Sequence, residues 1–314
     1  ENVLNEDGIL NEANASSFVQ WEPIGEPTRV VDLEDSTKSI EVENARAFKG
    51  VLNGQNYNIV GMYINVGNIW DQALISQNYG IIKNILIIGG YIYSEGTDIG
   101  SLIAYNGGII ENCVNGCLVT RPSNLGTWCG GIVGNNAESG IVLSCNNVAI
   151  LNGIGVGGGI AGVNYGVIQQ SFNSADIYVE RDLETNFGGI ADVNYGKIIG
   201  CYNTGEITSG ELIRVGGVVG RNAGEIIECY NTGNISANIY AGGITYSSTG
   251  TVSDCWNSGN ITASNGRASG IVCNSNGNLK NSFNLGTIFG IIIYIFEIIC
   301  LVILSLFLIS NFFL

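Results

Sequence analysis

The sequence predicts an all-β protein: a single-stranded right-handed parallel β-helix (β-solenoid) of about eight coils of 26–30 residues, followed by a C-terminal transmembrane helix. Three observations lead to this prediction. A seven-residue block recurs eight times at nearly constant spacing. No stretch between residues 48 and 287 keeps a 3.6-residue apolar period, and the short apolar runs end at Gly, Asn or Ser. The last 27 residues carry a single charge.

The repeated block defines the coils. Successive copies start 28, 30, 28, 30, 28, 26 and 27 residues apart, which indicates one stacked unit with small insertions at one corner. The copies are "QALISQN" at Gln72, "GSLIAYN" at Gly100, "GGIVGNN" at Gly130, "GGIAGVN" at Gly158, "GGIADVN" at Gly188, "GGVVGRN" at Gly216, "GGITYSS" at Gly242 and "SGIVCNS" at Ser269.

Each copy carries apolar residues at fixed positions, and we expect three short strands per coil around one shared core. The third residue of every block is aliphatic, and further aliphatic columns follow it. The first column is Leu74, Leu102, Ile132, Ile160, Ile190, Val218, Ile244 and Ile271. The second is Ile82, Ile110, Val142, Ile168, Ile198, Ile226, Val252 and Leu279, and the third is Tyr91, Val119, Leu151, Ile177, Ile207, Ile235, Ile261 and Ile288.

Strand alternation then assigns the inner and outer sides of the stretch "CYNTGNI". Cys229, Asn231, Gly233 and Ile235 share one phase and are expected inside, whereas Tyr230, Thr232 and Asn234 face out. Ile226 can also point inward only if a corner or bulge interrupts the alternation at Ile227 and Glu228. The glycine that follows most blocks, as at Gly196 and Gly224, is expected to hold a turn with positive φ.

Two polar columns and one cysteine column are expected to stack inside the solenoid. An amide both donates and accepts, so stacked asparagines can satisfy one another from coil to coil. The asparagine columns are Asn115, Asn147, Asn173, Asn203, Asn231, Asn257 and Asn284, and Asn78, Asn106, Asn136, Asn164, Asn194 and Asn222. Cys113, Cys145, Cys201, Cys229 and Cys255 share a column with Ile85, Ser171 and Ser282. This slot favours buried thiols. Stacked strands hold Cβ atoms farther apart than the roughly 3.8 Å that a disulfide prefers, and the absence of a C-x-x-C pair disfavours a metal site.

The repeat G-G-I-x-G-x-N-x-G-x-I-x-x-C-[YFW]-N-[TS]-G-x-I resembles the GLUG repeat, best seen in "GGVVGRNAGEIIECYNTGNIS" from Gly216. Upstream, "WEPIGE" at Trp21 and "FKGVLNGQNYNIVGMYI" at Phe48 resemble the entry segment that often precedes such repeats in bacterial surface proteins. The resemblance implies an adhesin-like or peptidase-associated protein whose repeats supply no catalytic residues. The cysteine column departs from the family pattern, in which a small residue such as serine is common.

The candidate binding residues are the aromatic side chains next to the cysteine column. If the cysteines face in, these rings form an outer stripe that could hold a glycan or a partner protein, or could only stabilise the sheet through contacts with one another. We call Phe172, Tyr202, Tyr230, Trp256 and Phe283 the aromatic stripe.

Composition removes several kinds of chemistry. The chain has no histidine, and its net charge of −15 disfavours a nucleic-acid partner. No catalytic residue, cofactor or metal ligand is predicted, and the chain is not expected to be an enzyme. The alternative is a carbohydrate-active β-helix enzyme, a polysaccharide lyase or glycosidase, whose candidate carboxylates would be Asp182 and Asp192. The charged loop "ADIYVERDLET" is interpreted as a solvated turn.

The ends of the chain complete the predicted organisation: an acidic linker or cap at 1–47, the repeat solenoid at 48–288 and a membrane segment at 289–314. The last segment is long enough to cross a bilayer, although a reading-frame slip or a gene-fragment end that translated apolar codons would look the same. The combined prediction is an extracellular, membrane-anchored surface protein with an adhesive or structural role. A further alternative is an accessory repeat region of a secreted peptidase.

Overall fold

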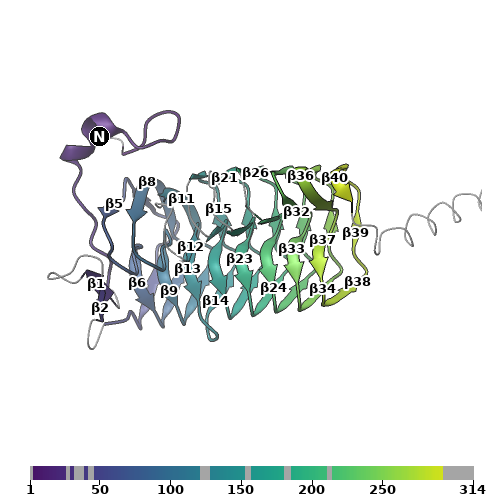
Figure 1. Ribbon diagram of the computed structural model, residues 1–314. Coiled ribbons are helices and arrows are strands. Elements are labelled where there is room, and N and C mark those ends of the chain that lie inside the picture. Colours follow the sequence, from purple (N-terminus) through teal and green to yellow (C-terminus); the bar gives the residue numbers. More distant parts are fainter. Residues whose placement is uncertain are drawn as a thin grey trace, which may run out of the picture.

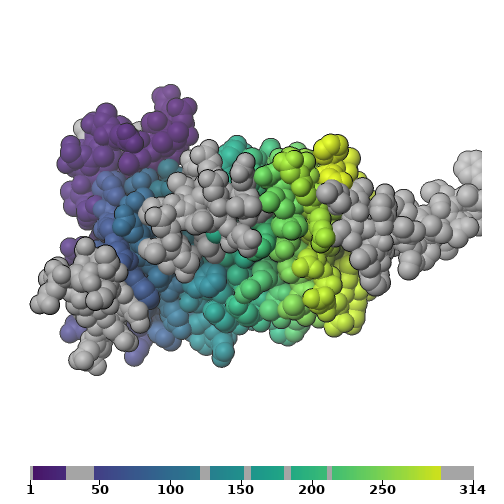
Figure 2. All heavy atoms as spheres, viewed as in Figure 1, coloured from purple at the N-terminus to yellow at the C-terminus, as the bar shows by residue number. Residues whose placement is uncertain are grey.

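The computed structural model shows a parallel β-solenoid whose coils stack along one axis (Figure 1). It describes residues 3–25, 29–31, 39–41, 46–120, 128–152, 157–179, 185–210 and 214–292. Every pairing between the strands of the solenoid is parallel, and each strand pairs with its equivalents in the coils before and after. The predicted all-β solenoid of about eight coils is confirmed. The bands of colour in Figure 2 follow one another along the axis, as expected when each coil contacts only its neighbours.

Two sides of the solenoid are regular sheets. The nine-stranded sheet contains β3 (Val51–Asn53), β7 (Ile81–Lys83), β10 (Ile109–Glu111), β14 (Ile141–Leu143), β19 (Val167–Gln169), β24 (Lys197–Ile199), β29 (Glu225–Ile227), β34 (Thr251–Ser253) and β38 (Asn278–Lys280). The eight-stranded sheet contains β6 (Ile75–Asn78), β9 (Ile103–Asn106), β13 (Val133–Asn136), β18 (Ala161–Asn164), β23 (Ala191–Asn194), β28 (Val219–Asn222), β33 (Thr245–Ser248) and β37 (Val272–Ser275).

The third side is divided into three rows of short strands. The first row is β4 (Asn58–Val60), β8 (Leu86–Ser94), β11 (Val114–Thr120), β15 (Asn146–Asn147), β20 (Phe172–Asn173), β25 (Tyr202–Asn203), β30 (Tyr230–Asn231), β35 (Trp256–Asn257) and β39 (Phe283–Asn284). The second row is β5 (Tyr63–Val66), β16 (Leu151–Asn152), β21 (Ile177–Val179), β26 (Ile207–Ser209), β31 (Ile235–Ala237), β36 (Ile261–Ser269) and β40 (Ile288–Ile292). The third row is β12 (Cys129–Gly130), β17 (Gly157–Gly158), β22 (Asn186–Gly188), β27 (Arg214–Gly216) and β32 (Tyr240–Gly242).

The expectation of three strands per coil was therefore wrong. The coil that starts at Gly158 contains β18 to β22, because the third side bends twice instead of running straight. The corner before the third row also absorbs most of the variation in coil length. Two residues join β31 to β32, whereas β36 runs through the same corner without a break. The predicted insertion corner is thus confirmed.

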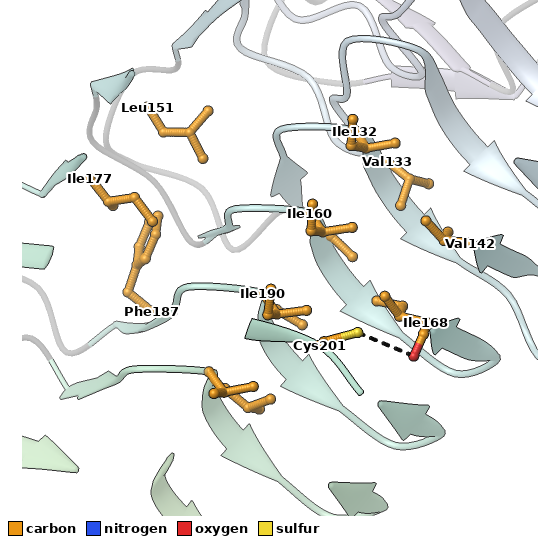
Figure 3. Close-up of a cluster of buried hydrophobic side chains, with 14 of the residues drawn as sticks. Ile132, Val133, Val142, Leu151, Ile160, Ile168, Ile177, Phe187, Ile190 and Cys201 are labelled. Atoms are coloured by element: carbon orange, nitrogen blue, oxygen red, sulfur yellow. Dashed lines mark hydrogen bonds between the residues drawn. The ribbon is translucent and has the colours of Figure 1, made fainter. Parts of the chain in front are cut away.

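The predicted aliphatic columns form the core. Figure 3 shows Ile132, Ile160 and Ile190 stacked in successive coils, and all three are fully buried. The third column was offset by one residue in its first coil: Val119 pairs with Ile92, and Tyr91 pairs with Leu118 instead. Strand β8 has one more residue than β11 at this point, next to Gly89 with φ of 60°. A bulge of this kind shifts the alternation by one residue.

The glycine column has a different reason from the one predicted. Gly196 and Gly224 do not have positive φ. A Cβ atom on Gly224 would collide with the carbonyl oxygen of Gly196, and one on Gly196 would collide with that of Gly166. The left-handed residue lies at the next corner instead, where Glu228 has φ of 55°. This confirms the interruption of alternation expected at Ile227 and Glu228.

The N-terminal part of the chain contacts the first coil. It contains the 3-10 helix η1 (Glu12–Ser17) and the antiparallel pair β1 (Arg29–Val31) and β2 (Ser39–Glu41). Trp21 packs against the core, and Ile24 and Phe48 form bridges to β6. The edge of the first coil is therefore partly paired.

Most of the predicted membrane segment, residues 289–314, lies outside the described residues, and its first four residues belong to strand β40. Within the ranges that the structure describes, no helix is both long and apolar enough to span a bilayer.

Candidate functional site

The aromatic stripe lies on the outer surface of the third side. Strand register places Phe172, Tyr202, Tyr230, Trp256 and Phe283 directly above one another. The ring centroids of Phe172 and Tyr202 are 4.8 Å apart, those of Tyr202 and Tyr230 are 4.7 Å apart, and those of Tyr230 and Trp256 are 4.5 Å apart. The planes of these pairs differ by only 6°, 2° and 7°. The structure thus brings the predicted residues together in one row.

The stacking decides which part of each ring a ligand can reach. Both faces of Tyr202 and Tyr230 are covered by neighbouring rings, and both side chains are half-buried. Burial and the neighbouring Tyr202 raise the pKa of Tyr230, so its hydroxyl stays protonated and able to donate. The middle of the stripe therefore presents ring edges and hydroxyl groups. A sugar ring that needs an open aromatic face finds none at these two tyrosines.

The cysteine column under the stripe is buried, as predicted. Cys229 is fully buried, and its Sγ lies 3.2 Å from the carbonyl oxygen of Ile227 and 3.5 Å from that of Ile198. Burial and the neighbouring thiol of Cys201 raise the pKa of Cys229 well above its usual value. A protonated, inaccessible thiol is a poor nucleophile. The free cysteines among the described residues are Cys113, Cys117, Cys129, Cys145, Cys201, Cys229, Cys255 and Cys273.

The asparagine ladders hold the strands beneath the stripe in register. The Nδ2 of Asn231 donates to the Oδ1 of Asn257 at 2.7 Å and to the carbonyl oxygen of Gly233 at 2.8 Å. The Nδ2 of Asn203 donates to the Oδ1 of Asn231 at 2.8 Å. The second ladder repeats this pattern from Asn78 to Asn222, with distances of 2.7–2.8 Å. Both predicted ladders are confirmed.

Of the two candidate carboxylates of the enzyme alternative, Asp192 is the one that the structure describes. Asp192 is fully buried on β23, and neither carboxylate oxygen has a hydrogen-bond partner. Burial raises its pKa well above the usual value, and Arg221 opposes that shift. A polysaccharide could not reach Asp192 without opening the coil. Asp182 and the other residues of the charged loop from 180 to 184 lie outside the described residues, whereas Asp176 accepts a hydrogen bond from the backbone of Glu206 at 2.8 Å.

Sequence reasoning missed a second set of aromatic and basic side chains. Tyr165 and Tyr195 stack with centroids 4.9 Å apart, and Arg221 donates to the hydroxyl of Tyr195 at 2.8 Å. Arg214 lies over the ring of Tyr246 at 5.6 Å. The signal was present, because Tyr165 and Tyr195 each follow the last Asn of a block. Among the described residues, no group of three or more acidic, cysteine or histidine side chains could hold a metal ion.

Comparisons with known proteins agree with this architecture. Residues 212–236 match the family model "The GLUG motif". Part of the chain is similar to a "Putative Gly-rich membrane protein" of Evansella cellulosilytica, with 35% identity over 97 residues. That match covers 29% of this chain and only 9% of the relative. No solved structure matches the chain significantly. The coil that spans β27 to β31 therefore carries the GLUG motif, and the chain is a β-solenoid built from repeats of this type.

Proposed function

We propose that this chain is a surface-displayed repeat protein with an adhesive or structural role, and that the aromatic stripe is its contact surface for a partner protein. The GLUG motif and the partial similarity to a protein named as a membrane protein support an extracellular location at the cell surface. The rigid ladders of the interior support a scaffold role, because each coil is fixed to the next by side chains as well as by backbone pairing.

The observation that carries the proposal is the stacking of the stripe. The paired ring planes are nearly parallel at 4.5–4.8 Å, so the stripe offers a row of edges and hydroxyls at the spacing of β-strands. Half-exposed aromatic side chains give large contact area with little loss of side-chain entropy, which is typical of protein interfaces. Neutral glycans, which bind aromatic residues through open ring faces, are less well matched.

The test compares adhesion of beads coated with the chain to immobilised proteins and to neutral polysaccharides. Collagen, fibronectin and fibrinogen serve as the protein coats, and cellulose and chitin as the glycan coats. We expect adhesion to at least one protein coat, and a loss of at least tenfold when Tyr202→Ser and Tyr230→Ser are combined. Tyr178→Ser is the matched control, because Tyr178 is an exposed tyrosine on the same side of the solenoid but outside the stripe.

Three outcomes would contradict the proposal. The first is no adhesion to any protein coat. The second is adhesion that survives the double substitution at Tyr202 and Tyr230. The third is adhesion confined to cellulose or chitin, which would assign the stripe to glycans instead.

A further inference from the structure

A row of side chains runs along the corner between the eight-stranded and the nine-stranded sheet. Each residue of this row donates its backbone N–H to the carbonyl of the asparagine that ends the sheet strand one coil earlier, so successive residues lie directly above one another. We call Gly107, Ala137, Tyr165, Tyr195 and Ala223 the corner row. Strands β13 and β23, which precede Ala137 and Tyr195, lie near the middle of the solenoid (Figure 1).

The corner row holds one stacked pair of rings with a small residue at either end. The rings of Tyr165 and Tyr195 have centroids 4.9 Å apart and planes that differ by 6°. Arg221 of the following coil lies over the ring of Tyr195, 5.9 Å from its centroid. On the other side the row continues with Ala137, whose methyl group is too small to cover a phenol ring. Tyr165 is 39% exposed, and within the described ranges no second ring or guanidinium group lies against it.

A second tyrosine borders the position of Ala137 from the opposite side. The ring of Tyr79 lies across Gly107, because a Cβ atom on that glycine would be 2.6 Å from Cε1 of Tyr79. The turn after Ala137 is held toward the same coil, since the Oγ of Ser139 donates to the carbonyl oxygen of Gly107 at 2.9 Å. The coils of Gly107 and Tyr165 are two strand spacings apart, or about 10 Å. Tyrosine rings therefore flank a small residue on both sides.

Polar groups lie beside the uncovered face of Tyr165. Asn136 is fully buried in its ladder, so strand alternation places Asn135 and Ala137 on the outer side. The Oδ1 of Asn135 is shielded from water and has no hydrogen-bond partner among the residues that the structure describes. Such an acceptor is unfavourable until a donor reaches it. Burial and the neighbouring Tyr195 raise the pKa of Tyr165, so its hydroxyl keeps its proton and can donate.

We propose that the surface between Tyr79 and Tyr165 binds a neutral glycan. The apolar face of a sugar ring can stack on an uncovered tyrosine ring, and its hydroxyl groups can pair with Asn135 and with the hydroxyl of Tyr165. An acidic glycan is a poorer match, because Glu138 is exposed in the adjoining turn and the chain has a net charge of −15. This site is independent of the proposed role of the aromatic stripe, whose central rings are covered on both faces.

Isothermal titration calorimetry of the whole chain with laminarihexaose, maltohexaose and mannohexaose tests the proposal, and trigalacturonate serves as the anionic ligand. We expect at least one neutral hexasaccharide to bind and trigalacturonate not to bind. Ala137→Tyr should lower the affinity about tenfold or more, because a third stacked ring would cover the free face of Tyr165. Ala223→Tyr is the matched control: it adds the same ring at the other end of the pair and should not lower the affinity.

Both variants are expected to fold, because the corner row already holds tyrosine in two neighbouring coils, and circular dichroism checks this. The proposal is wrong if none of the three hexasaccharides binds, if Ala137→Tyr binds as tightly as the unchanged chain, or if trigalacturonate binds more tightly than the neutral sugars. Tyr202→Ser combined with Tyr230→Ser should leave hexasaccharide binding unchanged, and a loss there would place the glycan on the stripe instead. Ala137→Tyr should in turn leave adhesion to the protein coats unchanged, which separates the two proposals.

Discussion

Replacing Asn231 by alanine tests whether the asparagine ladders stabilise the solenoid. Asn231 is fully buried and takes part in three hydrogen bonds, with Asn203, Gly233 and Asn257, at 2.7–2.8 Å. Each neutral bond contributes about 1 kcal/mol net, so their loss alone costs about 3 kcal/mol. The Oδ1 of Asn257 and the carbonyl of Gly233 also lose a donor inside the protein. The expected total is about 3–5 kcal/mol, a large share of the roughly 5–15 kcal/mol that stabilises a typical protein.

Urea denaturation followed by circular dichroism measures this loss. Thr232→Ala is the matched control, because Thr232 is the exposed neighbour of Asn231, and its free energy of unfolding should change by less than about 0.5 kcal/mol. Asn284→Ala lies in the last coil of the same ladder and is only half-buried, so it should cost less than Asn231→Ala. Hydrogen exchange should speed up most in the coils beside Asn231, since each coil depends on its neighbours. A cost below about 1 kcal/mol for Asn231→Ala would refute the reasoning.

Three other predictions follow from buried and stacked side chains. Because burial raises the pKa of Asp192 above the ordinary 3.8, the folded chain binds this proton more tightly than the unfolded chain, and stability falls as pH rises past that value. Asp192→Ala should therefore raise the free energy of unfolding at pH 7 by about 1–3 kcal/mol. In this variant the free energy of unfolding should also fall less between pH 4 and pH 7 than in the unchanged chain, and an unchanged pH profile would contradict the reasoning. Tyr230→Ser should destabilise the chain by about 1–3 kcal/mol, since stacked rings contribute about 0.5–1.5 kcal/mol per pair, and an equal cost for Phe283→Ser, which is 47% exposed, would count against stacking. Cys229 should resist a thiol reagent at pH 8 in the folded chain and react after denaturation without reductant; mass spectrometry that finds it disulfide-bonded would disprove the buried thiol.

The parts of the fold that repeat could be read from the sequence because each column reports the same environment several times. Leu74, Ile132 and Ile244 lie in different coils, yet all are aliphatic and all are buried. The alternation from Cys229 to Ile235 also holds residue by residue. A stacked fold removes most of the ambiguity of a single strand, since register and side follow from the repeat.

The parts that the sequence did not reveal depend on backbone geometry. Gly224 is required because its backbone lies close to the preceding coil, not because of its own φ. Either requirement selects glycine, so the sequence cannot distinguish them. The extra residue beside Gly89 shifts the third aliphatic column by one residue in its first coil, and the spacing between blocks does not show this shift. The basic side chains were missed because Arg214 and Arg267 share a column with Tyr240 and Arg221 lies in another column, so no column is basic throughout.

The direction of the asparagine ladders has a consequence for the two ends of the molecule. In both ladders the Nδ2 of each asparagine donates toward the next coil in sequence, from Asn115 to Asn284 and from Asn78 to Asn222. The second N–H of the same amide is held by a turn carbonyl, as between Asn231 and Gly233, which fixes this orientation. The amide dipoles therefore add along the axis instead of cancelling, and each bond in the chain polarises the next. Each ladder is therefore electrically polar along the solenoid axis. The ladder that begins at Asn115 reaches the last coil at Asn284, and a strand that continued it would have to offer an acceptor, as Asn284 offers its Oδ1 to Asn257.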